Sequence, residues 1–232
     1  ETGAFGTESY ILTGYFNLVK VLEITLHNGV EPLTGKSIGI PTGEVTKMQS
    51  FEDLVHAFDQ QLRYFIDIKI KGSNTIDRIF AENIPVPFLS LVIEDCIANG
   101  KDYNNGGARY NTSYIQGVGL GSITDILTSI RLHVFDKKDI TLGELLEATH
   151  HNFKDQENLR NTLLNHTPKY GNDDDYADAQ ATLVFNLFHA AVDGRPNTKG
   201  GKYRINMLPT TSHVYFGSVT GATADGRLAF KP

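Results

Sequence analysis

The sequence predicts an α/β fold that is rich in helices and has few strands. Three observations support this: amphipathic stretches recur along the chain, Gly- and Pro-rich connections separate them, and only two short segments alternate like strands. Of the 232 residues, 40% are hydrophobic and 21% are charged, which is ordinary for a folded globular protein. We see no repeat, low-complexity tract or domain boundary, and we therefore expect residues 1–232 to form one domain unit.

The first predicted helix spans residues 18–26 and ends at Asn28-Gly29, because both residue types accept a left-handed backbone. Residues 29–49 are predicted to form a long loop with short strands. A capping-box-like start at Ser50-Phe51-Glu52-Asp53 introduces a second helix. The buried face of this helix would carry Leu54, Phe58, Leu62 and Phe65.

A third helix is expected after Pro85 and Pro87, ending at Asn99-Gly100. A Gly-rich tract over residues 106–121 leads into a helix over 123–134. The segment Thr141-Leu142-Gly143-Glu144 caps another helix, and residues 178–192 form a further one that stops at Gly194. Residues 203–208 and 213–218 are the predicted strands, whereas 111–116 make a poor buried strand.

Charge and cysteine content narrow the classes of function. The net charge of −6 and the absence of a Lys/Arg cluster argue against nucleic-acid and anionic-membrane partners and favour small-molecule chemistry. Apolar runs are too short for a membrane span. The single cysteine, Cys96, allows no intrachain disulfide and suits a reducing cytoplasm; its apolar neighbours predict a buried thiol without catalytic function.

Three motifs resemble functional sites, but the spacing of their residues does not fit those sites. In Gly117-Val118-Gly119-Leu120-Gly121, the third glycine of a dinucleotide fingerprint would fall on Ser122, so tight backbone packing is preferred. The run Asn172-Asp173-Asp174-Asp175 lacks the alternating ligands of a calcium loop and predicts a cap or a solvated turn. Adjacent His150 and His151 point about 100° apart on a helix, so they cannot easily share a metal. We predict no metal site.

Several ordered blocks resemble the glycyl radical enzymes. The first, which begins Glu1-Thr2-Gly3 and continues to Tyr15-Phe16-Asn17, resembles the segment after the catalytic cysteine in the Gly-Cys-x-Glu motif of that family. The remaining blocks cover residues 97–111, which contain Gly106-Gly107-Ala108, together with 116–119, 167–173, 207–218 and 221–227. The resemblance extends over essentially the whole chain.

The resemblance implies a fold and a set of roles. The fold would be part of the ten-stranded α/β barrel of the family, with residues 1–232 forming a single partial domain. Glu1 would transfer a proton during elimination of water, Tyr15 would hydrogen-bond the substrate, and Thr210 would line its pocket. The presence of Cys-x-Glu distinguishes the eliminating branch from formate lyases, and Thr2-Gly3 with Tyr15-Phe16-Asn17 most resembles the members that dehydrate trans-4-hydroxy-L-proline.

The resemblance also implies partners that lie outside this sequence. The catalytic cysteine would precede Glu1, and the Arg-Val-x-Gly-Tyr radical loop is absent, so we expect the isolated chain to be inactive. In the family, a radical S-adenosylmethionine activase with an iron–sulfur (4Fe-4S) cluster installs the glycyl radical, and the enzyme is usually a homodimer. No cofactor is expected to bind this segment itself.

Three alternatives to this interpretation of the sequence remain open. The first is a related glycyl radical lyase or dehydratase that acts on glycerol, another diol or an aminoalcohol, or a protein similar to formate C-acetyltransferase. The second is a non-catalytic paralogue that keeps the scaffold. The third, a nucleotide-binding protein, is disfavoured by the glycine spacing.

Overall fold

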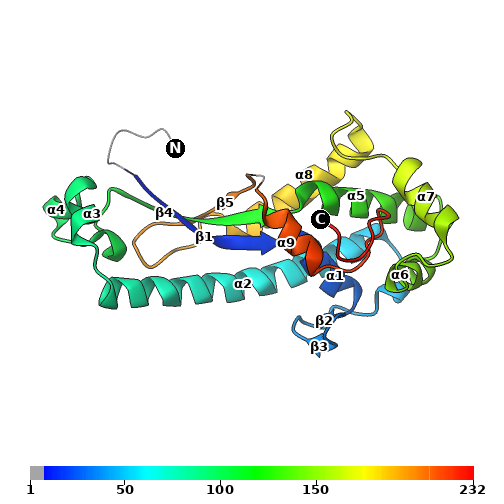
Figure 1. Cartoon of the computed structure of the whole chain (residues 1–232), viewed down its shortest axis with the longest axis horizontal. Helices are drawn as coiled ribbons and strands as arrows, with labels where there is room; N and C mark the ends of the chain where they lie inside the picture. Colours follow the sequence, from blue (N-terminus) through cyan, green and yellow to red (C-terminus); the bar gives the residue numbers. More distant parts are fainter. Residues whose placement is uncertain (1–7, 209) are drawn as a thin grey trace. The chain divides into compact units, whose positions relative to one another are not determined.

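The computed structural model describes residues 8–208 and 210–232, and Figure 1 traces their elements in chain order. The chain divides into two compact units, each assembled from segments that are far apart in the sequence. The first combines Glu1–Phe16, Ile66–Gln116 and His189–Met207; the second combines Asn17–Phe65, Gly117–Phe188 and Leu208–Pro232.

The first unit is built on a three-stranded sheet. Its strands β1 (Glu8–Asn17), β4 (Tyr110–Val118) and β5 (Tyr203–Asn206) lie in the order β1-β4-β5, and β4 pairs with β5 in parallel. The C-terminal half of α2 (Phe51–Asn83) runs alongside this sheet (Figure 1). The fully buried Tyr203 joins the two layers, because its hydroxyl donates to Asn74 Oδ1 at 2.9 Å.

Polar residues are buried in β4, which explains why sequence reasoning missed this strand. Ser113 and Gln116 have exposed fractions of 0% and 1%. Ser113 is satisfied there because the Asn197 amide donates to its hydroxyl at 2.9 Å. The prediction that residues 111–116 make a poor buried strand is therefore wrong, because Asn197, which is distant in the sequence, supplies the hydrogen bond that buried Ser113 requires.

The predicted third helix is interrupted. Two short helices, α3 (Pro87–Val92) and α4 (Cys96–Asn99), replace it beyond the C-terminal end of α2 (Figure 1), followed by the 3₁₀ turn η2 (Tyr103–Asn105). Asp95 adopts a left-handed φ of 73°, and the Arg109 guanidinium holds the break by pairing with Asp95 at 2.9 Å and Glu94 at 3.1 Å. Cys96 is buried and Gly100 ends α4, both as predicted.

The second unit is mainly helical. It begins with α1 (Leu18–Leu26), the short strands β2 (Val30–Glu31) and β3 (Lys36–Ser37), the 3₁₀ turn η1 (Val45–Lys47) and the N-terminal half of α2. It continues with α5 (Leu120–Ile130), α6 (Leu142–His150), α7 (Glu157–Asn165), most of α8 (Asp175–Val192) and α9 (Ser212–Ser218). The most deeply buried large side chains include Leu18, Leu22, Leu54, Phe58, Leu62, Ile123, Ile126, Leu127 and Phe188.

Local capping signals were predicted correctly. The bounds of α1 are those expected, with Asn28 at φ 51° and Gly29 at φ 86° after it. At the start of α2, Asp53 accepts from the Ser50 N–H while its own N–H donates to Ser50 Oγ. At α6, Thr141 and Glu144 form the reciprocal capping box.

Two elements of the second unit differ from expectation. Residues 213–218 form helix α9 instead of a strand: a six-residue alternation is too short to distinguish the two periods, and the His213 ring bonds back to the Thr210 carbonyl in a helical turn. The helix α7 was missed because it is polar, with Leu163 as its buried residue.

The predicted helix over 123–134 is confirmed and has an unusual end. Beyond α5 it continues as the π-helix η3 (Arg131–Asp136). The His133 side chain, 3% exposed, contacts the Asp139 carboxylate through Nδ1 at 3.1 Å and Thr167 Oγ1 through Nε2 at 2.9 Å. Within the described residues, no helix combines the length and the apolarity that a membrane crossing requires.

Candidate active site

The three predicted site residues lie in different parts of the chain. Glu1 lies outside the described residues. Tyr15 stands on β1 in the first unit with 45% of its surface exposed, and Thr210 is half-buried just before α9 in the second unit. The contacts around Tyr15 come from the first unit, and those around Thr210 come from the second.

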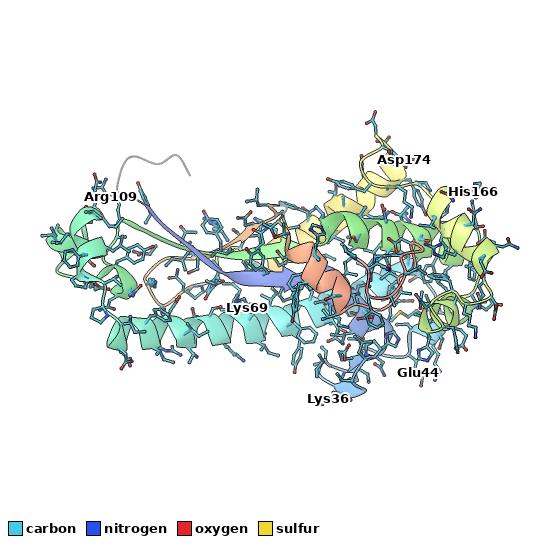
Figure 2. The ribbon with its side chains drawn as sticks, viewed as in Figure 1. Lys36, Glu44, Lys69, Arg109, His166 and Asp174 are labelled. Atoms are coloured by element: carbon cyan, nitrogen blue, oxygen red, sulfur yellow. The ribbon has the colours of Figure 1, made fainter. Side chains whose placement is uncertain are left out.

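The backbone that leads into Tyr15 is fixed by a side chain from α2. Lys69 lies on α2 (Figure 2). Its Nζ donates to the Thr13 carbonyl and, at 3.1 Å, to Ser73 Oγ. Gly14 adopts φ 131°, which favours glycine, and a Cβ there would lie 3.1 Å from Lys69 Nζ. Tyr15 therefore projects from a strand whose preceding residues are held by a hydrogen-bonded lysine.

Burial perturbs the lysine that makes these bonds. Desolvation lowers the pKa of the Lys69 ammonium, and the negative charge of Asp77 opposes that shift. Thr13 adds a second anchor, because its hydroxyl donates to the Tyr114 carbonyl at 2.9 Å on the neighbouring strand. Sequence reasoning missed Lys69, since nothing in its local sequence signals a contact with a residue 56 positions away.

Thr210 lies in a small hydroxyl network. Its Oγ1 hydrogen-bonds the Ser212 hydroxyl, and its carbonyl accepts from His213 Nδ1 at 2.7 Å. This arrangement fixes the Thr210 backbone at the start of α9 and links its hydroxyl to that of Ser212. Ser212 and His213 were missed as positioning residues, although their spacing of two and three residues from Thr210 suits such local bonds.

Two glycines lie where neighbouring backbone leaves no room for a side chain. A Cβ at Gly107 would lie 2.1 Å from the Lys101 carbonyl oxygen, and one at Gly201 would lie 1.7 Å from that of Asn111. At the end of β4, Gly119 has φ 92° and precedes α5, as expected for a packing glycine.

The block over residues 221–227 is anchored to α1. Glu23, 7% exposed, accepts from the Gly221 N–H at 2.7 Å and pairs with Lys20 at 2.5 Å. The Arg227 guanidinium donates to the Gly221 carbonyl at 2.6 Å. These contacts make the block a packing element of the second unit.

The acidic tract serves as a cap. Asp174 Oδ1 accepts from the N–H groups of Tyr176 and Ala177 at 3.0 and 3.2 Å, at the start of α8. His150 and His151 are exposed at the end of α6. Among residues 8–208 and 210–232, no group of three or more His, Cys, Asp or Glu side chains could hold a metal ion.

Comparison with known proteins agrees with this architecture. A family model described as pyruvate formate lyase-like matches residues 1–217. The chain is 54% identical over 232 residues to the trans-4-hydroxy-L-proline dehydratase of Clostridioides difficile, covering 100% of this chain and 29% of that protein. It therefore spans less than a third of the length of this curated relative.

Two solved structures share the fold. The structure of hydroxyproline dehydratase from Clostridioides difficile with substrate trans-4-hydroxy-L-proline bound matches with a TM-score of 0.97 at 54% identity, over 100% of this chain and 29% of that one. The glycerol-bound B12-independent glycerol dehydratase from Clostridium butyricum matches with a TM-score of 0.90 at 38% identity, over 94% of this chain and 27% of that one. The predicted α/β class, as part of a larger barrel fold, is confirmed.

Proposed function

Because this chain belongs to the pyruvate formate lyase-like family, we propose that it is part of a longer protein, the parent protein, that eliminates water from a small hydroxylated molecule. The first candidate substrate is trans-4-hydroxy-L-proline. The observation that carries this choice is the 54% identity, over the whole chain, to the dehydratase that acts on it.

In the proposed reaction, this chain supplies polar groups around the substrate. A glycyl radical on the parent protein would supply abstraction of a hydrogen atom next to the carbon that bears the hydroxyl, and the return of a hydrogen atom after water has left. Glu1 then transfers a proton so that the hydroxyl departs as water. Tyr15 donates a hydrogen bond to the substrate or to that hydroxyl, and Thr210 lines the pocket.

The pinned backbone before Tyr15 supports its proposed role. A phenol that must hold a leaving hydroxyl in one position benefits from a rigid strand, and the Lys69 contact supplies that rigidity. The hydroxyl pair of Thr210 and Ser212 supports a role in orientation, since the Thr210 side chain is held in place before any substrate binds.

We further propose the partners that such chemistry requires. A radical S-adenosylmethionine activase with a 4Fe-4S cluster would install the radical, under anaerobic conditions in the cytoplasm, and the parent protein would be a homodimer. This chain binds none of these cofactors itself.

The proposal is tested by turnover of the activated parent protein with two substrates. We expect trans-4-hydroxy-L-proline to be dehydrated and glycerol to be turned over at least about a hundredfold more slowly, because a site built for one set of polar groups discriminates strongly against another. Tyr15→Phe should lower kcat/KM by about tenfold to a hundredfold, the loss of a hydrogen bond worth roughly 1.5–3 kcal/mol.

Matched variants separate chemistry from folding. Glu1→Gln should abolish turnover while leaving the yield of glycyl radical unchanged, as measured by electron paramagnetic resonance. The surface change Thr182→Ala serves as a control and should leave both unchanged. Preference for glycerol would assign the protein to another dehydratase, and a radical without turnover of either substrate would remove the hydroxyproline assignment.

A further inference from the structure

A pocket of about 310 Å³ lies wholly within the first unit. Its walls come from β1, from the C-terminal half of α2, from η2 and from the loop before β5. The apolar part of the lining includes Ile11, Ile76 and Phe80, with the Tyr103 side chain beside them. The volume is in the range of small-molecule sites, and the walls are mostly apolar.

One acidic side chain in this pocket has unmet hydrogen-bonding capacity. Asp77 is 8% exposed, and its Oδ2 is buried without a hydrogen-bond partner in the described part of the chain. A buried carboxylate without donors is costly, so such groups in native proteins call for an explanation. Burial raises the pKa of Asp77, while the positive charges of Lys199 and Lys69 oppose that rise.

One basic side chain in the same pocket has an ammonium to which no described protein group is hydrogen-bonded. Lys199 is 7% exposed, and its Nζ lies 5.6 Å from the centre of the Tyr103 ring. Within the described residues, this ammonium donates no hydrogen bond and forms no ion pair within 4.0 Å. Its backbone is held in place, because Asn197 Oδ1 accepts from the Lys199 N–H at 3.0 Å.

Two other charged side chains near the pocket, Asp102 and Lys69, already form hydrogen bonds within the protein. The Asp102 carboxylate accepts from the N–H groups of Val86 and Asn104 and from the Ser90 hydroxyl, at 2.8 to 2.9 Å. Lys69 donates to the Thr13 carbonyl and to Ser73 Oγ. Asp77 and Lys199 therefore remain as an anion and a cation that line one pocket without contacting each other.

We propose that this Asp77–Lys199 pocket binds a small zwitterionic amino acid with an apolar side chain. The ammonium of the ligand would pair with Asp77, its carboxylate would pair with Lys199, and its apolar body would lie against Ile76 and Phe80. A zwitterion satisfies both buried charges at once, whereas a simple acid or amine leaves one of them unpaired. Neither Tyr15 nor Thr210 is among the residues that line this pocket.

The test is isothermal titration calorimetry on the natural, unactivated protein with three probes of equal apolar body. L-leucine carries both charges, 4-methylpentanoate lacks the ammonium, and 3-methylbutylamine lacks the carboxylate. We expect L-leucine to bind at least about tenfold more tightly than either truncated probe, because each lacks one charge-assisted bond. Equal affinities, or no saturable binding of L-leucine at millimolar concentration, would overturn the proposal.

Two charge variants locate the binding. Lys199→Gln should weaken the binding of L-leucine and of 4-methylpentanoate at least about tenfold and should leave the binding of 3-methylbutylamine unchanged. Asp77→Asn should weaken the binding of L-leucine and of 3-methylbutylamine and should leave the binding of 4-methylpentanoate unchanged. Both variants should keep dehydration turnover, which shows that they fold. L-leucine affinity that is unchanged in both variants would exclude this pocket.

Two further variants test whether L-leucine binds in this pocket or at the dehydration site. Ile76→Trp fills the pocket from a residue that is already 56% exposed, so it should block L-leucine without disturbing the core. Tyr15→Phe should leave L-leucine affinity unchanged. If L-leucine instead competes with trans-4-hydroxy-L-proline for turnover, it binds at the dehydration site and the proposal fails.

Discussion

Gly14 has a backbone conformation and a neighbour that both exclude a side chain. With φ at 131° and Lys69 Nζ 3.1 Å from a Cβ, an alanine would strain the backbone of β1 and displace the lysine that holds the Thr13 carbonyl. We expect Gly14→Ala to lower the free energy of unfolding by roughly 1–3 kcal/mol, as measured by urea denaturation.

Gly72→Ala is the matched control for this change. Gly72 lies within α2, in the same unit, and a Cβ there would meet nothing within 4 Å. This substitution should raise the free energy of unfolding by roughly 0.5–1 kcal/mol, because alanine loses less backbone entropy in a helix. If both variants shift stability in the same direction, the argument from Gly14 geometry is wrong.

Glu31 gives a stability contribution that depends on pH. Burial of this carboxylate would raise its pKa, but hydrogen bonds from Lys20 at 2.7 Å and from Thr34 outweigh burial and lower the pKa from 4.5 to about 2. Because the folded-state pKa is depressed, the contribution is complete above pH 4.5 and is lost as the pH falls toward 2.

Glu31→Gln should therefore cost about 2 kcal/mol at pH 7, since it removes charge-assisted bonds from a nearly buried site. The difference from the unsubstituted protein should shrink between pH 4.5 and 2, which urea titrations at several pH values would reveal. Glu44→Gln, which removes an exposed pair with Lys47, serves as the control and should change stability by less than about 0.5 kcal/mol. If the difference in unfolding free energy between Glu31→Gln and the unsubstituted protein does not vary with pH, the pH-dependent stability does not come from Glu31.

The start of α6 is stabilised by a capping box that is readable from the sequence. Thr141 caps α6 by accepting from the Glu144 N–H at 3.2 Å, while the Glu144 carboxylate accepts from Thr141. Thr141→Ala should lower the free energy of unfolding by about 1 kcal/mol. Thr182→Ala, at an exposed position within α8, should be neutral or slightly stabilising, and equal losses in the two variants would remove the capping explanation.

Elements determined by near neighbours were predictable, and those determined by distant partners were not. The bounds of α1 and the starts of α2 and α6 follow from caps within four residues. The strand β4 depends on Asn197, and the break between α3 and α4 depends on Arg109, 14 residues beyond Asp95. No local pattern encodes these contacts.

The candidate site shows the same division. Tyr15 and Thr210 are predicted as site residues through resemblance to a family, because neither carries a distinctive local pattern. Lys69, which holds the strand before Tyr15, and the Asp77–Lys199 pocket became visible only when α2 was placed beside β1.

At the scale of the whole molecule, the first unit exposes apolar side chains on α3 and α4. Phe88 is 87% exposed, Val92 68%, Leu91 63% and Ile97 69%, and α3 buries none of its residues. Exposed apolar clusters of this kind mark surfaces that another body covers. We expect the isolated chain to bind a hydrophobic dye and to self-associate.

Phe88→Ser combined with Leu91→Ser should reduce both dye fluorescence and self-association of the isolated chain, as measured by analytical ultracentrifugation. Leu33→Ser, at a 49% exposed position of the second unit, is the control and should change neither. If dye binding persists in the double variant, another surface is responsible. In the parent protein the same cluster should not bind dye, because we expect it to be covered there.

The π-helix that prolongs α5 has a consequence for how this chain can change over generations. A π turn holds more residues than an α turn, so η3 is equivalent to a helix that has absorbed an inserted residue. Deleting one residue there would restore regular α-helical geometry, and the side chains within this segment would then point in new directions. His133 lies within this segment, so its side chain would lose its contacts with both Asp139 and Thr167. A single deletion in η3 therefore removes both side-chain contacts of a buried histidine at once, so that His133 constrains the length of this segment.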